Sequence, residues 1–347
     1  MKTNLKGLSL VGLQDFMASH GHEKFRAKQL FKWIYGRGLN TFDEMTNLSK
    51  PLREELSHIS YIGSLQLLSE QASQKDGAVK FLFGLEDGQR IESVLMFDRE
   101  RVTLCISTQV GCALDCKFCA TGMLGLTRQL STGEIVDQLL SVQRITNSKV
   151  TNLVCMGMGE PFHNYQNLME ACDILSDESG PSLARRRIVV STSGLVSRIY
   201  QFADEQRKFK LAISLNASDD ATRSEIMPLN RKWPIARLLE AARYYCEKSG
   251  ERVTFEYVLM DGINDSKLDA QRLFALASSV NCKLNLIPYN ATMGRFRRPS
   301  EARIGQFFEA LQGLWLPVTI RWSKGDDIDA GCGQLAAKAS ESALSSD

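Results

Sequence analysis

Three cysteines in one short run are the residues of this chain best suited to chemistry. Cys112, Cys116 and Cys119 have the spacing Cys-x3-Cys-x2-Cys, and Phe118 stands directly before the last thiol. Cysteine thiolates hold iron–sulfur clusters, and a four-iron cubane takes four ligands. Three thiolates therefore leave one iron open, and an open iron can bind a small molecule.

A structural zinc site is the alternative interpretation of the same run. Structural zinc takes four ligands, usually as two close pairs. The chain contains no second Cys-x2-Cys, and its four histidines, His20, His22, His58 and His163, do not accompany the cysteines. The spacing therefore favours an iron–sulfur cluster with one open position.

Two more cysteines stand in unusual places. Cys332 lies between two glycines in the run Gly325–Leu335, a setting that suits a mobile, reactive thiol better than a structural one. Cys105 lies on an expected strand, where a cysteine more often belongs to the core. The other four cysteines are interpreted as small buried hydrophobes: Cys155, Cys172, Cys246 and Cys282.

Polar residues follow several expected strands at the point where each strand ends. The runs are Met156–Pro161, Ser191–Gly194, Ser214–Asn216 and Pro288–Asn290. Glu160 in the first run could accept a hydrogen bond from an amino group, and its glycines could let backbone approach a ligand. Because such strand ends meet at one face, the pattern predicts a small-molecule pocket beside the cysteine loop.

The elements that must position these residues alternate along the chain. Apolar, β-branched runs predict strands at 102–107, 153–156, 188–191, 211–215, 253–259, 283–288 and 318–322. Helical periodicity falls between them at 132–146, 165–176, 195–206, 234–248, 267–280 and 301–313. Alternating strands and helices imply parallel pairing. Six such units predict an α/β fold, a partial (β/α)6 barrel with ligands at the carboxyl ends of its strands.

The regions outside the barrel predict smaller parts. Residues 1–60 read as a helical accessory domain, with helices near 15–17 and 25–35, a short helix after Thr41 and a third helix from Pro51. Residues 61–97 read as a strand-rich linker, 98–330 as the catalytic core, and 331–347 as a segment with a reactive cysteine and a frayed tail.

Composition sets the broad class. The 347 residues are 44% hydrophobic and 24% charged, typical of a globular protein. No apolar run reaches the length of a signal peptide or a membrane span, and the nine cysteines suit a reducing compartment, so we expect a cytoplasmic protein. The net charge is only +2, but basic clusters occur at 185–187, 231–232 and 295–298, where arginines beside aromatics suit RNA contact.

Taken together, these motifs resemble the radical S-adenosylmethionine (SAM) superfamily and, within it, the RlmN/Cfr family of RNA adenosine methyltransferases. The matching segments are Phe25–Leu30, Thr108–Cys112, Cys116–Gly122, Met156–Pro161 and Gly325–Leu335. Glu160 followed by Pro161, and the Ala-Gly-Cys-Gly run around Cys332, are more similar to the RlmN branch than to the Cfr branch. One departure is Asn216, which stands where the family usually has histidine.

The resemblance implies roles for individual residues. Cys112, Cys116 and Cys119 would hold one 4Fe–4S cluster per chain, and the cluster's free iron would bind SAM. Cys332 would become an S-methylcysteine intermediate, Cys105 would resolve the product through a transient disulfide with Cys332, and Glu92 would be a proton acceptor. The SAM site would be lined by Gly159, Glu160, Ser191, Ser214, Leu215, Asn216 and Asn290.

The resemblance also implies the reaction. Two SAM molecules would be consumed per turnover, one as methyl donor and one as the source of a deoxyadenosyl radical. The product would be adenosine methylated at carbon 2 in 23S ribosomal RNA, and also at adenosine 37 of transfer RNA. An electron donor such as flavodoxin or ferredoxin would be needed, and the enzyme would act as a monomer away from membranes.

Two alternatives remain open from the sequence. The first is methylation of carbon 8 of a 23S ribosomal RNA adenosine, as in the Cfr branch, which would use the same thiols. The second is an iron–sulfur protein that binds RNA and senses redox state without catalysis, since a cluster alone can serve sensing or electron transfer.

Overall fold

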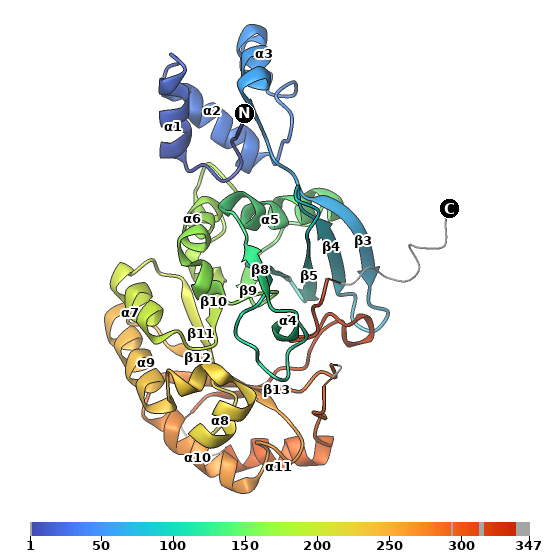
Figure 1. Cartoon of the computed structure of the whole chain (residues 1–347), viewed down its shortest axis with the longest axis vertical. Coiled ribbons are helices and arrows are strands. Elements are labelled where there is room, and N and C mark those ends of the chain that lie inside the picture. The colour runs from blue at the N-terminus through green and yellow to red at the C-terminus, as the bar shows by residue number, and fades with distance from the viewer. Residues whose placement is uncertain (1, 293, 312–315, 338–347) are drawn as a thin grey trace.

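A single large sheet forms the centre of the computed structural model, which describes residues 2–292, 294–311 and 316–337 (Figure 1). Its ten strands lie in the order β14-β13-β12-β11-β10-β9-β6-β5-β4-β3. Seven of them pair in parallel: β6 (Arg101–Cys105), β9 (Asn152–Cys155), β10 (Ile188–Thr192), β11 (Lys210–Ser214), β12 (Val253–Leu259), β13 (Cys282–Pro288) and β14 (Val318–Ile320).

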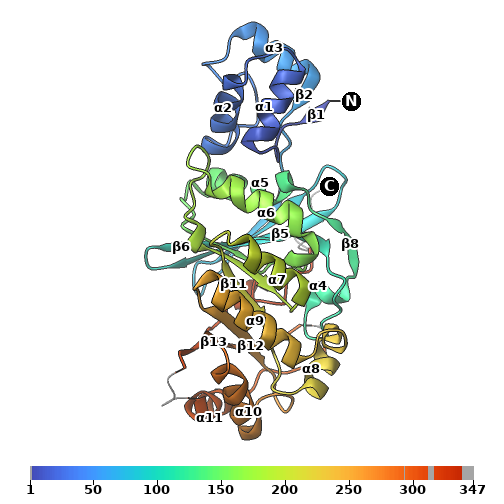
Figure 2. The same cartoon turned by 90° about the vertical axis from the view of Figure 1, so that its left-hand side faces the viewer.

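Helices connect the parallel strands and cover the outer face of the sheet (Figures 1 and 2). They are α5 (Thr132–Thr146), α6 (Tyr165–Ser176), α7 (Val196–Glu205), α9 (Ile235–Ser249), α10 (Lys267–Ser278) and α11 (Glu301–Leu311). The predicted α/β barrel units are confirmed to within a few residues. The last two residues of the helix predicted at 301–313, and the tail predicted to fray from 338 on, lie outside the described residues.

Three antiparallel strands extend the same sheet beyond β6. They are β3 (Gln66–Ala72), β4 (Val79–Gly84) and β5 (Arg90–Asp98), and β5 pairs directly with β6. Phe81, Phe83 and Leu95 are fully buried, so this segment shares the core of the barrel. The strands expected in 61–97 are therefore part of the main sheet.

The N-terminal residues form a small helical module at one end of the elongated molecule (Figure 2). It contains α1 (Leu10–Ser19), α2 (Phe25–Phe31) continued by one π-helical turn (Lys32–Gly36), and α3 (Lys50–Ile59). Strands β1 (Thr3–Asn4) and β2 (Ser60–Tyr61) pair to close it. The prediction of a short helix after Thr41 is wrong, because residues 41–49 form turns.

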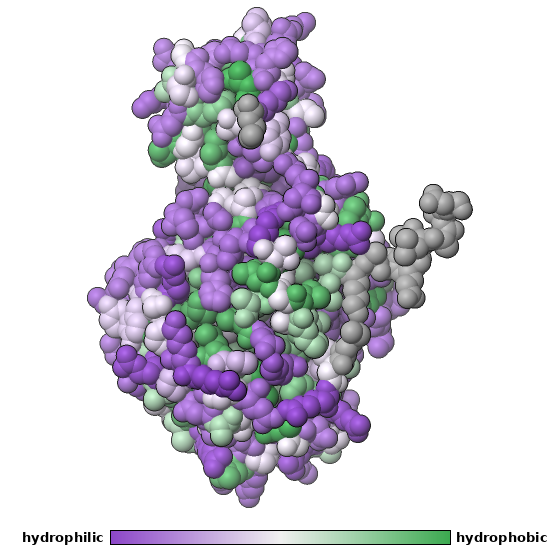
Figure 3. Space-filling view, in the orientation of Figure 1, coloured by the Kyte–Doolittle hydropathy of each residue, from purple (hydrophilic) through white to green (hydrophobic). Residues whose placement is uncertain are grey.

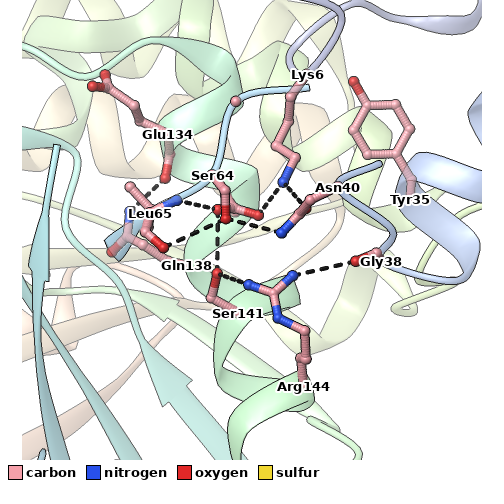
Figure 4. Close-up of polar contacts among 12 residues, drawn as sticks. Lys6, Tyr35, Gly38, Asn40, Ser64, Leu65, Glu134, Gln138, Ser141 and Arg144 are labelled. Atoms are coloured by element: carbon pink, nitrogen blue, oxygen red, sulfur yellow. Dashed lines mark hydrogen bonds and ion pairs between the residues drawn. The ribbon is translucent and has the colours of Figure 1, made fainter. Parts of the chain in front are cut away.

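A buried polar cluster joins this module to the barrel (Figure 4). Lys6 Nζ lies 2.5 Å from Asp137 Oδ1 on α5 and donates to Asn40 Oδ1 at 2.8 Å. Asp137 Oδ2 accepts the N–H of Leu65 at 2.7 Å, where the chain enters the sheet. Gly133 on α5 lies so close to Lys6 that a Cβ there would be 2.5 Å from the Lys6 carbonyl oxygen. One carboxylate therefore binds the module, the entry to the sheet and the first barrel helix together.

Four of the short elements that were not predicted lie near the carboxyl ends of the parallel strands. They are β7 (Gln109–Gly111), α4 (Ala120–Met123), β8 (Leu126–Gln129) and α8 (Asp220–Ile226). The first three surround the cysteine loop, and α8 lies beyond the end of β11. Among the described residues, no helix combines the length and the apolar character needed to cross a membrane.

Candidate active site

A cavity of about 150 Å³ lies at the carboxyl ends of the parallel strands, where the sequence placed the ligand pocket. The Cys112, Cys116 and Cys119 side chains all line it, and so does Cys332 from the far end of the chain. Figure 3 shows apolar side chains gathered on this face near α4 and β8, and Met123, Leu124 and Leu126 there are 39–52% exposed. The structure thus brings the two predicted groups of thiols to one cavity.

Backbone contacts shape the cysteine loop. The Cys112 N–H donates to Gly125 O at 2.8 Å, and the Cys119 N–H donates to Cys116 O at 3.0 Å. Gly111 has φ +77°, and a Cβ there would lie 1.9 Å from Gly125 O, so no other residue fits. These contacts turn the loop back over the strand ends and present its thiols to the cavity.

The three thiols suit an iron–sulfur cluster better than any use as free thiols. Burial raises the pKa of Cys112 to about 12 and raises the pKa of Cys116 and Cys119, and repulsion from neighbouring thiolates adds to the effect, from Cys332 in the case of Cys119. Their thiolates would therefore need a bound cation. In the part of the chain that the structure describes, no three such side chains converge on a single ion, but each thiolate of a cubane binds a different iron. The donor set fits a cluster with one open position.

Glu160 lies at the end of β9, but its carboxylate already has protein partners. Oε1 accepts the Phe162 N–H at 3.0 Å, and Oε2 accepts the Ser193 N–H at 2.7 Å. The neighbouring glycines approach protein rather than a ligand. A Cβ on Gly157 would be 2.7 Å from Ile106 O, and one on Gly159, at φ +100°, would be 2.5 Å from Gln109 Cβ. The turn is thus built by close packing, and Gly159 and Glu160 both line the cavity.

The ends of β10 and β11 also reach the cavity, through Ser191, Ser214 and Asn216. Leu215 is fully buried and does not line it. Asn216 has a left-handed φ of 56°, which asparagine tolerates better than most residues. Its Oδ1 accepts the Val258 N–H at 2.9 Å, so this side chain serves mainly to hold the loop in place.

Arg223 on α8 organises these strand ends and was missed from the sequence. Its side chain is fully buried and donates to the carbonyl oxygens of Ser193, Ser214 and Leu215 at 2.7–3.1 Å. Loss of hydration lowers its pKa to about 10. The sequence indicates this role only weakly, because α8 is short and an isolated arginine is usually exposed.

The Cys332 segment is tied to two separate parts of the fold. Asn290 Nδ2 donates to Cys332 O at 3.0 Å, and the Ala120 N–H of the cysteine loop donates to Gly333 O at 2.7 Å. A Cβ on Gly331 would be 2.7 Å from Asn290 Nδ2. Of the two glycines that suggested mobility, Gly331 therefore serves close packing, and Gly333 has a left-handed φ of +85°.

Cys105 and Cys332 both belong to the wall of a smaller cavity next to the first. Both line it together with Arg321, and Cys332 lines both cavities. Burial raises the pKa of Cys105 to about 12, with the nearby Cys332 adding to this and Arg321 opposing it. All cysteines are free in the structure. The two thiols predicted to react with each other are thus neighbours.

Glu92 on β5 is buried and lines neither cavity. Its Oε2 accepts the N–H groups of Ala336 and Ala337 at 2.8 and 2.9 Å, and its Oε1 lies 3.6 Å from Lys80 Nζ. In this arrangement the carboxylate anchors the chain just after Cys332.

The basic segment 295–298 is largely committed to the fold. Phe296 is 7% exposed and packs against Tyr289, so it offers no face for base stacking here. Arg298 donates to Tyr289 O at 2.7 Å and to Asn290 Oδ1 at 3.1 Å. Arg295 is exposed but pairs with Glu225.

Two family models match the chain. Residues 3–62 match the ribosomal RNA large subunit methyltransferase N-terminal domain, and residues 106–274 match the radical SAM superfamily. The first match covers the helical module and the second covers most of the parallel sheet.

Full-length relatives agree with these matches. The chain is 47% identical to a dual-specificity RNA methyltransferase RlmN from Pelobacter propionicus, with 97% of the chain and 96% of that protein covered. It is 45% identical to a probable dual-specificity RNA methyltransferase RlmN from Staphylococcus epidermidis, covering 97% and 93%. The crystal structure of a radical SAM methyltransferase from Sphaerobacter thermophilus superposes with a TM-score of 0.93 at 45% identity, covering 97% and 100%.

Proposed function

Because the chain belongs to the RlmN family of radical SAM RNA methyltransferases, we propose that it methylates carbon 2 of an adenosine in 23S ribosomal RNA and in transfer RNA. The observation that supports this best is the shared cavity: the Cys332 thiol faces the same space as Cys112, Cys116 and Cys119. Cys332, the methyl acceptor of this proposal, would thus act beside the residues suited to hold the cluster.

Cys112, Cys116 and Cys119 would hold one 4Fe–4S cluster, which when bound supplies the electron that cleaves SAM reductively to a deoxyadenosyl radical. Glu160, Ser191, Ser214, Asn216, Gly159 and Asn290 line the remaining wall and would position SAM. Leu215 would support this wall rather than contact SAM, since its side chain is buried and its backbone groups bond Arg223 and Glu256. Outside the cluster, the chain's own task is to orient the reactants and exclude water.

Two thiols, those of Cys332 and Cys105, would take part in transfer of the methyl carbon. Cys332, as thiolate, would attack the methyl carbon of one SAM, so that a new S–C bond forms while the sulfonium C–S bond breaks and S-adenosylhomocysteine leaves. The deoxyadenosyl radical would take one hydrogen atom from this methyl group and leave as 5′-deoxyadenosine, and the methylene radical would add to carbon 2 of adenine. The adduct would lose the carbon 2 proton and return the unpaired electron to the electron donor. Cys105, as thiolate, would then attack Cys332 sulfur, the bond to the RNA-bound carbon would break with its electron pair, that carbon would take a proton to become the methyl group, and a Cys105–Cys332 disulfide would form. The shared cavity of these two residues supports that step.

The substrate explains why such chemistry is needed. Carbon 2 of adenine is not nucleophilic, so direct displacement on SAM cannot methylate it. A carbon radical needs close approach and correct orientation. The adenine must therefore leave its stack and enter the cavity, as in other enzymes that act on a base.

We further propose a division of labour along the chain. Residues 1–60 would contact RNA, 98–330 would form the radical SAM core with 61–97 as its strand-rich extension, and 331–347 would carry the reactive thiol. A flavodoxin or ferredoxin would supply electrons to a monomeric enzyme. Nine unpaired cysteines suit the reducing cytoplasm, where RNA substrates are found.

The test is nucleoside analysis of ribosomal and transfer RNA from cells with and without the gene. We expect 2-methyladenosine to disappear from both RNAs on deletion. Loss of 8-methyladenosine instead would support the Cfr-like alternative. If the reduced, reconstituted protein releases no 5′-deoxyadenosine from SAM, the redox-sensor alternative is favoured.

A further inference from the structure

Glu256 is a buried carboxylate in the main cavity that no step above uses. It lies in the middle of β12, is 5% exposed, and lines the cavity together with Ser214 and Cys332. Its Oε2 atom is buried and has no hydrogen-bond partner among the described residues. Buried polar atoms in folded proteins are nearly always paired, so an unpaired carboxylate oxygen requires an explanation.

A chain of hydrogen bonds across three strands fixes the orientation of this carboxylate. Thr319 Oγ1 on β14 donates to Asn285 Oδ1 at 2.7 Å, and Asn285 Nδ2 on β13 donates to Glu256 Oε1 at 3.0 Å. The three residues are in register on neighbouring strands. This chain of hydrogen bonds occupies Oε1 and leaves Oε2 without a partner among the described residues.

The protein does not neutralise this charge by direct contact. Burial raises the pKa of Glu256, while Arg321 and Lys283 lower it from a distance. Across the described ranges, no lysine or arginine forms an ion pair with Glu256. The cavity therefore keeps an acceptor that no side chain or backbone group of the described residues satisfies, and that a donor from a bound molecule can pair.

The position of Glu256 indicates which kind of molecule supplies that donor. Ser214, its register neighbour on β11, is among the residues proposed to contact SAM. A carboxylate repels phosphate and carboxylate groups but accepts from hydroxyl and amino groups. An adenosine moiety offers both, through its ribose hydroxyls and its exocyclic amine.

We propose that Glu256 Oε2 accepts a hydrogen bond from an O–H or N–H group of an adenosine moiety bound in this cavity. The inference rests on the proposed function, in which both SAM and the target nucleotide carry such a moiety. Thr319 and Asn285 act as positioning residues that hold the carboxylate in place.

The experiment compares the full chain, anaerobically reconstituted, with its Glu256→Gln variant. Glutamine keeps the volume and can still accept from Asn285, but it places an NH2 group where Oε2 stood. Affinity for S-adenosylhomocysteine is measured by calorimetry, and affinity for a hairpin RNA containing the target adenosine by fluorescence anisotropy. Glu240→Gln is the matched control, since it makes the same change at an exposed carboxylate on α9.

We expect Glu256→Gln to lower the affinity for one of these ligands by about ten- to a hundred-fold, because a hydrogen bond to a charged group is lost. Weaker S-adenosylhomocysteine binding places the donor on SAM, and weaker RNA binding places it on the target nucleotide. An analogue of the weakened ligand that lacks the donor should bind both proteins equally. Glu240→Gln should leave both affinities unchanged.

Unchanged affinity for both ligands in a folded Glu256→Gln protein would overturn the proposal. If that variant does not fold, Glu256→Asp, which keeps the charge but withdraws the carboxylate, is tested in the same way. Failure of the proposed function is a separate result, because it would appear as absence of 2-methyladenosine from reactions of the unaltered protein, whatever Glu256 binds.

Discussion

Replacing Lys6 with methionine tests how the helical module is held to the barrel. The Lys6 and Asp137 side chains are 1% and 2% exposed, and their charged atoms are 2.5 Å apart (Figure 4). Burial lowers the pKa of Lys6, and the nearby Asp137 carboxylate opposes this effect. The pair is therefore costly to bury, and each charge depends on the other.

The expected cost follows from the partners that remain. Removing one member of a buried ion pair typically costs about 3–5 kcal/mol, because the other charge stays buried without compensation. Asp137 Oδ2 keeps the Leu65 N–H and the Ser141 hydroxyl as donors. Lys6→Met should therefore lower the free energy of unfolding by about 3 kcal/mol, at the lower end of this range.

A double variant tests how much of this cost comes from the uncompensated charge of Asp137. In Lys6→Met/Asp137→Asn, the asparagine oxygen can still accept from Leu65 while the uncompensated charge is gone. This double variant should be more stable than Lys6→Met alone, so the two substitutions should be non-additive. Arg237→Met is the control, since the exposed Arg237–Glu240 pair should contribute less than about 1 kcal/mol.

Urea unfolding of the full chain measures how much unfolding free energy each variant loses. Hydrogen exchange shows which residues become less protected. The exchange data are needed because the module and the barrel can open separately. Exchange should speed up in residues 3–62 and in α5, and RNA methylation should fall more than methyl uptake by Cys332. A loss below about 1 kcal/mol for Lys6→Met, or strict additivity in the double variant, would refute this account of the interface.

Three further predictions concern the cavity. Cys332→Ala should abolish methyl uptake from SAM while leaving the iron–sulfur absorbance unchanged; loss of that absorbance would make Cys332 a ligand or a structural residue. Cys105→Ala should trap a covalent protein–RNA adduct visible on denaturing gels, and recovery of free RNA with full activity would remove Cys105 from the mechanism. Burial holds the pKa of Glu256 above its unfolded value, so its carboxylate destabilises the fold increasingly as pH rises from about 4. Glu256→Gln should thus raise the melting temperature at pH 7, and the gain should vanish near pH 4; a gain independent of pH would contradict this.

Local pattern was enough to predict the parallel strands and their helices. The buried strands read as continuous apolar runs, and the helices show the periodicity of one buried face. The cysteine spacing likewise predicted the loop at the cavity. In these cases the residues that carry the information are neighbours in sequence.

The sequence could not show which polar side chains the fold itself occupies. Asn216 and Asn290 were predicted as ligand contacts, yet one holds the Val258 N–H and the other holds the Cys332 carbonyl oxygen. Arg223 and Glu256 were overlooked, because their importance comes from partners on other strands. Such assignments depend on tertiary contacts that no local spacing encodes.

Glu92 shows how a single carboxylate can limit the mechanism. Both acceptor positions of its Oε2 are taken by the Ala336 and Ala337 N–H groups, so only Oε1, facing Lys80, could receive a proton in this arrangement. If Glu92 is to take a proton at the target adenine, the chain after Cys332 must first release Oε2 or the base must reach Oε1. Either route couples proton transfer to the segment that carries the reactive thiol, because the same carboxylate holds that segment in place.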